Sequence, residues 1–207
     1  FINKYIRIQH PTRGLINFNT YPFQDDCLNH FVDHRFNVIL KSRQLGISTL
    51  SACYAVWLVC FYRDKNVLVI ATKLAVAQNF IKKVKTALRS MPPWLMLPEI
   101  TSSNKQGVEF GNGSTIKAIP TSDDAGRSEA LSLLIVDEAA FIRNFDELWL
   151  GLYSTLSTGG RAIVLSTPNG VGDKYHDLCT QAKTGQNEFN FVKLLWDVHP
   201  ERDEEWF

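Results

Sequence analysis

The fold is decided by residues 36–49, which read FNVILKSRQLGIST. The first part, 36–40, is mostly apolar and is typical of a strand buried on both faces of a parallel sheet. The apolar run 48–62 that follows is typical of a buried helix. A loop between such a strand and helix directs backbone N–H groups at an anion, and the helix N-terminus adds its positive end. The stretch therefore predicts a phosphate-binding loop at 41–49, although a plain strand, turn and helix without a ligand has the same pattern.

The loop departs from the usual phosphate-binding pattern at one position. In the usual Gly-Lys-Ser/Thr ending, the lysine reaches the β- and γ-phosphates and the hydroxyl binds Mg²⁺. Gly46 and Ser48 fit this pattern, but Ile47 occupies the lysine position and carries no charge. We expect Lys41 to fold back over the loop onto the phosphates, and Arg43 to sense the γ-phosphate or brace the loop. Which of these two cations replaces the missing lysine stays open.

Two carboxylates follow another apolar run, because residues 133–138 read LLIVDE. A parallel strand delivers Asp137 at its C-terminal end, beside the phosphate loop, where ligands bind in such sheets. We expect Asp137 and Ser48 to hold Mg²⁺, and Glu138 to orient and deprotonate an attacking water. A strand followed by an acidic helix cap is the alternative. The combination with the phosphate loop favours a site for ATP and Mg²⁺.

Two further motifs fit the same site. Ser166, Thr167 and a proline end another expected strand, where a hydroxyl can bond the attacking water or the γ-phosphate and relay its loss. Residues 21–24 read YPFQ, in which the Gln24 amide can pair with the adenine edge and the Tyr21 ring can stack on the base. The alternatives are a strand followed by a turn proline, and a turn with a packed aromatic ring.

Apolar strand-like runs alternate with longer helical runs, which is typical of a parallel α/β sheet. The expected strands are 36–40, 66–71, 133–136, 161–165 and 189–196, the expected helices are 48–62, 74–89, 145–156 and 173–183, and a hairpin is expected from 108–110 and 115–119. Residues 1–35 show no clear pattern of elements. We therefore expect one P-loop NTPase domain of the RecA-like ASCE class over residues 1–207, with a mostly parallel sheet flanked by helices and a β-hairpin insertion.

Composition limits the other classes. The chain has 207 residues, 45% hydrophobic content and a net charge of +1, which suits one buried core but is less basic than most dedicated nucleic-acid modules. None of its four cysteines forms a CxxC pair, so we expect no zinc site and a reducing compartment. The most apolar stretch, 50–62, is shorter than the ~20 residues that span a bilayer, so no membrane partner is expected. The basic residues of the expected helix 74–89 are interpreted as a solvated face rather than a DNA contact: Lys82, Lys83, Lys85 and Arg89.

Together these motifs resemble the ATPase domain of the large terminase subunits of tailed bacteriophages, which are DNA-packaging motors. The resemblance runs from about residue 21 to 196 and rests on YPFQ at 21–24, SRQLG at 42–46, DEAAF at 137–141 and STPNG at 166–170. The loop of this family often has lysine after the glycine, and this chain is similar to the branch that has it at the start of the loop. The expected nucleotide contacts are Tyr21, Gln24, Ser42, Gln44, Leu45, Gly46, Ile47, Ser48 and Thr49.

The resemblance implies that ATP hydrolysis drives double-stranded DNA into a procapsid in the host cytoplasm. It implies a portal protein and a small terminase subunit as partners, and a homo-oligomeric ring on the portal from a chain that is monomeric when isolated. Arg127, before Asp137, would be a finger that reaches the ATP of a neighbouring subunit, worth ~10³–10⁵ in rate. A surface arginine beside Asp123 and Asp124 is the alternative.

Two further expectations and two alternative functions remain. The first residue is not Met, and we expect a fragment of a longer protein. The C-terminal nuclease domain of the family is expected to be absent, because no acidic cluster on strands follows the STP motif. A helicase-like ATPase that remodels nucleic acid remains an alternative, although it would need a second motor domain. A non-catalytic nucleotide-binding assembly domain is the other alternative, which Ile47 suggests and Glu138 opposes.

Overall fold

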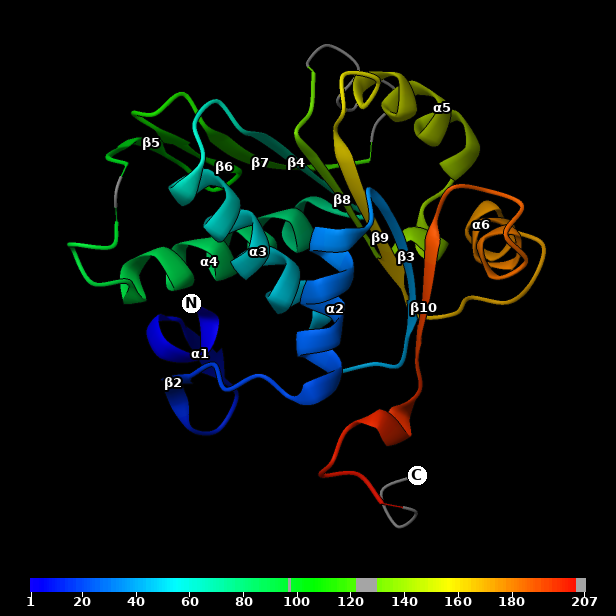
Figure 1. The fold of residues 1–207 in the computed structure, drawn as a ribbon, viewed down its shortest axis with the longest axis horizontal. Coiled ribbons are helices and arrows are strands. Elements are labelled where there is room, and N and C mark those ends of the chain that lie inside the picture. Colours follow the sequence, from blue (N-terminus) through cyan, green and yellow to red (C-terminus); the bar gives the residue numbers. More distant parts are fainter. Residues whose placement is uncertain (97, 122–129, 204–207) are drawn as a thin grey trace.

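One sheet forms the centre of the molecule (Figure 1). Within residues 1–96, 98–121 and 130–203, which the computed structural model of the chain describes, it has eight strands in the order β10-β3-β9-β8-β4-β7-β6-β5. The strands are β3 (Phe36–Lys41), β4 (Asn66–Ala71), β5 (Ile100–Ser103), β6 (Gly107–Phe110), β7 (Thr115–Pro120), β8 (Leu133–Asp137), β9 (Arg161–Ser166) and β10 (Asn190–Leu194).

The strands from β10 to β7 are parallel to one another, and β6 and β5 are antiparallel additions at one edge. The carboxyl ends of β3, β8 and β9 therefore lie together at the lower edge of the sheet in Figure 1. The mostly parallel α/β sheet is confirmed, and so is the hairpin. The hairpin belongs to the central sheet, because β7 pairs in parallel with β4.

Helices cover both faces of the sheet. One face packs against α2 (Pro22–Asp33), α3 (Ile47–Phe61) and α4 (Leu74–Ser90), and the other against α5 (Phe145–Thr155) and α6 (Lys174–Lys183). Short elements complete the chain: α1 (Ile2–Tyr5), β1 (Arg7–His10), β2 (Gly14–Asn17), η1 (Ala139–Phe141) and η2 (Trp196–Val198). The β1–β2 hairpin packs beside α4.

Side chains alternate between the two faces of the sheet along each strand, so an apolar core forms on each face. In β8, Leu133 and Ile135 pack on the α3 side, while Leu134 and Val136 pack on the α5 side. All four are fully buried, and full burial of such a side chain is worth about 1.5–3 kcal/mol. Because both faces are covered, the central strands are mostly apolar on both sides, which is why the sequence pattern located them.

The core also accounts for the uncharged residues around the phosphate loop. α3 is apolar all round because it lies between the sheet and its neighbours α2 and α4.

The four cysteines are free and buried: Cys27, Cys53, Cys60 and Cys179. No group of three or more His, Cys, Asp or Glu side chains that could hold a metal occurs among the described residues. None of the helices described here has the length and apolarity needed to cross a membrane.

Candidate nucleotide site

The expected phosphate loop joins the end of β3 to the start of α3. Gln44 and Gly46 have left-handed φ angles of 60° and 74°, so the backbone turns sharply before the helix begins. Leu45 and Ile47 are buried in the core, with 2% and 1% of their surface exposed. Ile47 therefore holds the lysine position in the sequence, but its side chain packs into the core. Its expected backbone contact with nucleotide stays a prediction.

Gln24 contacts the loop itself. Its Nε2 donates to the Leu45 carbonyl at 2.9 Å, and its Oε1 accepts from the Tyr21 N–H at 3.1 Å. The side chain is 3% exposed, and a Cβ added to Gly46 would lie 2.7 Å from its Nε2. The amide that was expected to read adenine therefore braces the loop in this structure, and the adenine contact of Gln24 stays a prediction.

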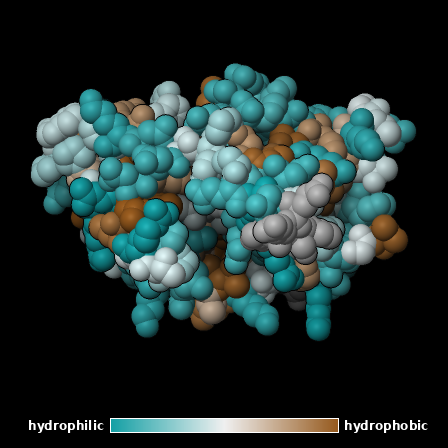
Figure 2. Space-filling model, turned by 90° about the horizontal axis from the view of Figure 1, so that it is seen from below, coloured by the Kyte–Doolittle hydropathy of each residue, from teal (hydrophilic) through white to brown (hydrophobic). Residues whose placement is uncertain are grey.

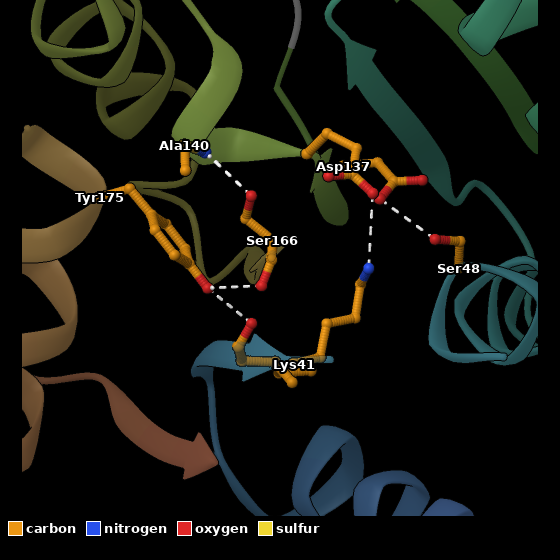
Figure 3. Close-up of polar contacts among 8 residues, drawn as sticks. Lys41, Ser48, Asp137, Ala140, Ser166 and Tyr175 are labelled. Atoms are coloured by element: carbon orange, nitrogen blue, oxygen red, sulfur yellow. Dashed lines mark hydrogen bonds and ion pairs between the residues drawn. The ribbon is translucent and has the colours of Figure 1, made fainter. Parts of the chain in front are cut away.

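Asp137 lies between Lys41 and Ser48, at the two ends of the loop, as Figure 3 shows. The Lys41 side chain, 7% exposed, extends from the end of β3 and places its Nζ 3.4 Å from Glu138 Oε1. At the start of α3, the Ser48 hydroxyl donates to Asp137 Oδ1 at 3.1 Å. The structure thus brings together four of the expected site residues from three elements.

Asp137 has the character of a metal ligand. Burial raises the pKa of its carboxyl, although Lys41, the Ser48 hydroxyl and Lys83 each act in the opposite direction. A buried carboxylate facing a hydroxyl is a set of hard oxygen donors, which Mg²⁺ prefers. Magnesium usually keeps several waters and uses one or two protein ligands with substrate phosphates. Ser48 and Asp137 therefore fit a Mg-nucleotide site without a larger acidic cluster.

Glu138 has an unusual backbone. Its φ of 57° places it in the left-handed region, which costs a side-chain-bearing residue of order 1 kcal/mol or more. The turn directs the chain from β8 into η1 while the side chain stays one third exposed. Its carboxylate can thus meet both Lys41 and a solvent molecule, as a general base requires.

A cavity of about 890 Å³ opens at the carboxyl edge of the sheet, and Glu138 borders it. Its lining residues are Lys41, Arg43, Gln44, Thr72, Lys73, Thr121, Glu138, Phe141, Arg143 and Thr167. Figure 2, which views this edge from below, shows a hollow near the centre with hydrophilic residues along much of its rim. Four cations against one carboxylate suit a polyanion, and sequence reasoning missed two of them, Lys73 and Arg143.

Lys83 is a further residue that the sequence interpretation missed. Instead of lying on a solvated face, it lines a second cavity of about 450 Å³ together with Ser48, Asp137 and Glu138. Burial lowers the pKa of the Lys83 ammonium, and the negative charge of Asp137 opposes this effect. The expectation of a wholly solvated lysine face is wrong at this position, whereas Lys82 is exposed. Helical spacing could have found it, because buried Phe80 lies one turn before Lys83.

The STP motif contacts the turn that follows Glu138, through the backbone of Ala140. The Ser166 hydroxyl, fully buried, accepts from the Ala140 N–H at 3.1 Å, and Asn169 Nδ2 donates to the Ala140 carbonyl at 3.0 Å. Ser166 is thus occupied by the protein, while Thr167 lines the larger cavity. From α6, the Tyr175 hydroxyl donates to the Ile39 carbonyl at 2.6 Å and lies 3.4 Å from the Ser166 carbonyl (Figure 3).

The remaining residues that were expected to bind nucleotide make no hydrogen bond or ion pair with the acidic pair in the described part of the chain, or lie outside it. Arg127 and its neighbours Asp123 and Asp124 lie outside the described residues. Tyr21 is half-buried and stacks on Phe23, with ring centroids 5.8 Å apart. Ser42 and Thr49, at the two ends of the loop, are half-buried. Their contacts with nucleotide stay predictions.

Comparison with known proteins places this geometry in context. Residues 38–201 match the family model described as terminase large subunit, T4likevirus-type, N-terminal. The large terminase ATPase domain of Thermus phage P74-26 is 21% identical, with a TM-score of 0.74 over 91% of this chain and 86% of that chain.

Two longer structures are also similar. The HK97 bacteriophage large terminase is 15% identical, with a TM-score of 0.71 over 98% of this chain and 44% of that one. The large terminase of a thermophilic bacteriophage, in complex with ATP-gamma-S, is 12% identical, with a TM-score of 0.69 over 90% and 47%. These likenesses show the fold, and the chain spans less than half the length of the latter two proteins.

Proposed function

Since the chain belongs to the family of terminase large subunits, in their T4likevirus-type N-terminal part, we propose that it hydrolyses Mg-ATP to move double-stranded DNA into a procapsid. The observation that carries the proposal is the convergence of the phosphate loop, the Ser48–Asp137 pair and Glu138 at one edge of the sheet. The complex of a similar phage terminase with ATP-gamma-S supports a nucleotide in this fold.

The loop binds the triphosphate in this proposal. Backbone N–H groups ahead of Ser48 and the N-terminus of α3 face the anion. Lys41, at the end of β3, supplies the positive charge for the phosphates that Ile47 lacks. Its Nζ already lies beside the acidic pair. Arg43, exposed on the larger cavity, is placed to sense the γ-phosphate.

Ser48 and Asp137 would hold Mg²⁺ together with the phosphates. When bound, the metal supplies Lewis-acid charge that stabilises the phosphate oxygens. Glu138 orients a water and accepts its proton at the carboxylate, which the Lys41 contact keeps close to the loop. Because this carboxylate reaches the larger cavity, the water can approach from the side of Thr167.

The STP motif would transmit the loss of the γ-phosphate to the rest of the domain. Ser166 and Asn169 hold both backbone groups of Ala140, two residues after Glu138. A movement of Glu138 on loss of the γ-phosphate therefore displaces β9 and the loop that follows it. This path would connect hydrolysis to mechanical motion.

The partners follow from the family. We propose that copies of the chain act as a ring on the portal, with the small terminase subunit delivering viral DNA in the host cytoplasm. Arg127 of one subunit would reach the ATP of the next. A helicase-like role would share this site and differ in its partner, so stimulation by duplex DNA with the portal favours packaging and strand separation favours the helicase.

The test of the proposed chemistry is Glu138→Gln. It should bind ATP like the wild type and lower the hydrolysis rate by about 10²–10⁴, because only the proton acceptor is lost. Glu109→Gln, an exposed change on β6, is the matched control and should hydrolyse normally. Wild-type turnover by Glu138→Gln would contradict the assignment, and binding without turnover by the wild type itself would favour an assembly domain.

A further inference from the structure

Side chains from two distant segments hold successive carbonyls of the phosphate loop. Arg202 Nη2 donates to the carbonyls of Arg43 at 3.1 Å and Gln44 at 3.3 Å, and Gln24 Nε2 donates to the next one, Leu45, at 2.9 Å. Arg202 belongs to the segment after β10, residues 196–203, which we term the C-terminal segment. At the lower edge of Figure 1 this segment runs past the start of α2.

The C-terminal segment is anchored to the N-terminal motif as well as to the loop. The Tyr21 hydroxyl donates to Glu201 Oε1 at 3.0 Å, and the Tyr21 ring lies 4.6 Å from the His199 ring, centroid to centroid. Within the segment, the Arg202 N–H donates to the His199 carbonyl at 3.0 Å. These contacts fix the backbone from which the Arg202 side chain extends.

Holding these carbonyls has a consequence for the opposite side of the loop. A peptide carbonyl and the N–H of the next residue point in opposite directions, so tying the carbonyls of residues 43–45 back directs the following amides toward the anion. Gln44 needs such support, because its left-handed φ of 60° is unfavourable for a residue with a side chain. The guanidinium also adds a permanent positive charge beside the loop.

We propose that Arg202 is a positioning residue of the nucleotide site, which keeps the phosphate loop in its anion-binding shape and makes the C-terminal segment respond to nucleotide. The proposal rests on the proposed function for its ligand. It differs from the relay through Ser166, because it acts on the loop that binds phosphate and not on the acidic pair. By linkage, nucleotide and the Arg202 contact stabilise each other.

Calorimetric titration with ADP tests the affinity. Arg202→Ala should bind about tenfold more weakly, the size expected for losing a charged donor to the loop, and Arg202→Lys should recover part of the loss. Arg63→Ala, an exposed arginine after α3, is the matched control and should bind like the wild type. Equal affinity of Arg202→Ala and the wild type overturns the proposal.

Hydrogen exchange of the C-terminal segment separates positioning from simple packing. In the wild type, saturating ADP should slow exchange at the amides of His199, Glu201 and Arg202, and in Arg202→Ala this slowing should disappear even when ADP is saturating. The same slowing in both proteins overturns the proposal, since a packing contact alone would predict it.

A nucleotide-free measurement keeps this inference distinct from the proposed function. If the wild type binds no ADP, the proposed function fails. Arg202 is then judged by the Ser42 amide, which donates to the Leu194 carbonyl at 2.9 Å where β3 enters the loop. Faster exchange of this amide in Arg202→Ala than in Arg63→Ala supports the positioning role, and equal exchange overturns it.

Discussion

Lys41 and Lys83 approach the acidic pair from different elements, β3 and α4, and both act on Asp137. The charges of the site are therefore partly balanced before any metal or nucleotide arrives. Partial balance lets Asp137 and Glu138 stay close together at a buried edge of the sheet. Asp137 is still retained at a cost in desolvation, because burial raises the pKa of its carboxyl, so binding and stability are opposed at this residue.

The pH dependence of stability should reveal this cost at Asp137. Burial raises the native pKa of its carboxyl above the unfolded value, so its contribution is fully favourable below the unfolded pKa and is lost as pH rises through the native pKa. Without metal or nucleotide, Asp137→Asn should therefore unfold at a higher temperature than the wild type at pH 8. The gap should shrink toward pH 5. A wild type as stable as the variant at pH 8 would contradict this account.

Lys83 should tune the response to magnesium. Lys83→Met removes a cation from the cavity that holds Asp137, so ADP should need about three- to tenfold less Mg²⁺ for half-maximal binding, a modest value for a partly screened charge. Arg89→Met, which removes an exposed cation near the end of α4 that does not line this cavity, is the control and should leave the Mg²⁺ requirement unchanged. An unchanged or higher requirement in Lys83→Met argues against a role near the metal.

At the scale of elements, β8 and β9 are joined by more than their ladder. Ser166 and Asn169, at and after the end of β9, hold the N–H and the carbonyl of Ala140 in η1. Tyr175 adds a contact from α6 to the carboxyl end of β3. The ends of three parallel strands are thereby linked through side chains, in the region where the nucleotide is proposed to bind.

The contact between Ser166 and Ala140 should contribute to the free energy of unfolding. Ser166→Ala leaves the Ala140 N–H buried without its acceptor, and chemical denaturation should show a loss of about 1–3 kcal/mol in the free energy of unfolding. Ser154→Ala removes an exposed hydroxyl that bonds the Gly151 carbonyl, and should change stability by less than about 0.5 kcal/mol. Equal losses in the two variants would show that the Ser166 contact is not important.

The sequence was informative where local pattern and burial agree. Apolar runs located β3, β4, β8 and β9 within a residue or two, because strands covered on both faces have no solvated side. α2 was missed, although Phe23, Cys27 and Phe31 repeat every four residues and are buried as that spacing predicts.

Contacts between distant segments could not be predicted in the same way. The partners of Gln24, Lys83 and Arg202 depend on how α2, α4 and the C-terminal segment pack around the loop. The amide of Gln24 and the hydroxyl of Ser166 suited a ligand by their chemistry, yet both bond the backbone of the protein. Sequence pattern identifies which groups can bind, and tertiary packing decides which of them remain available.

At the scale of the whole molecule, the site lies on an open edge of the sheet. The larger cavity carries Lys73 and Arg143 beyond the residues that contact the acidic pair. An open, cationic edge is compatible with a neighbouring subunit that completes the site. The proposed ring, in which Arg127 would act in trans, needs such an open edge.

Mixing two inactive variants tests the ring. Arg127→Ala retains Glu138, and Glu138→Gln retains Arg127, so each should be nearly inactive alone on the portal, with a loss of ~10³ or more for the finger. Mixed rings should regain part of the ATPase activity, because a Glu138→Gln subunit can supply Arg127 to its neighbour. Arg127→Lys is the control for charge alone. No recovery on mixing would assign Arg127 to its own subunit or to the surface.

The central claim is that the loop ahead of Ser48 and the carboxylate of Asp137 form one Mg-nucleotide site. Calorimetric titration of ATPγS in the presence of Mg²⁺ tests it most directly, with Lys41→Ala and Arg43→Ala measured beside the wild type. The account predicts one nucleotide per chain, with affinity lost mainly in Lys41→Ala. No binding heat from the wild type at millimolar nucleotide would contradict it, and a loss confined to Arg43→Ala would transfer the phosphate role to Arg43.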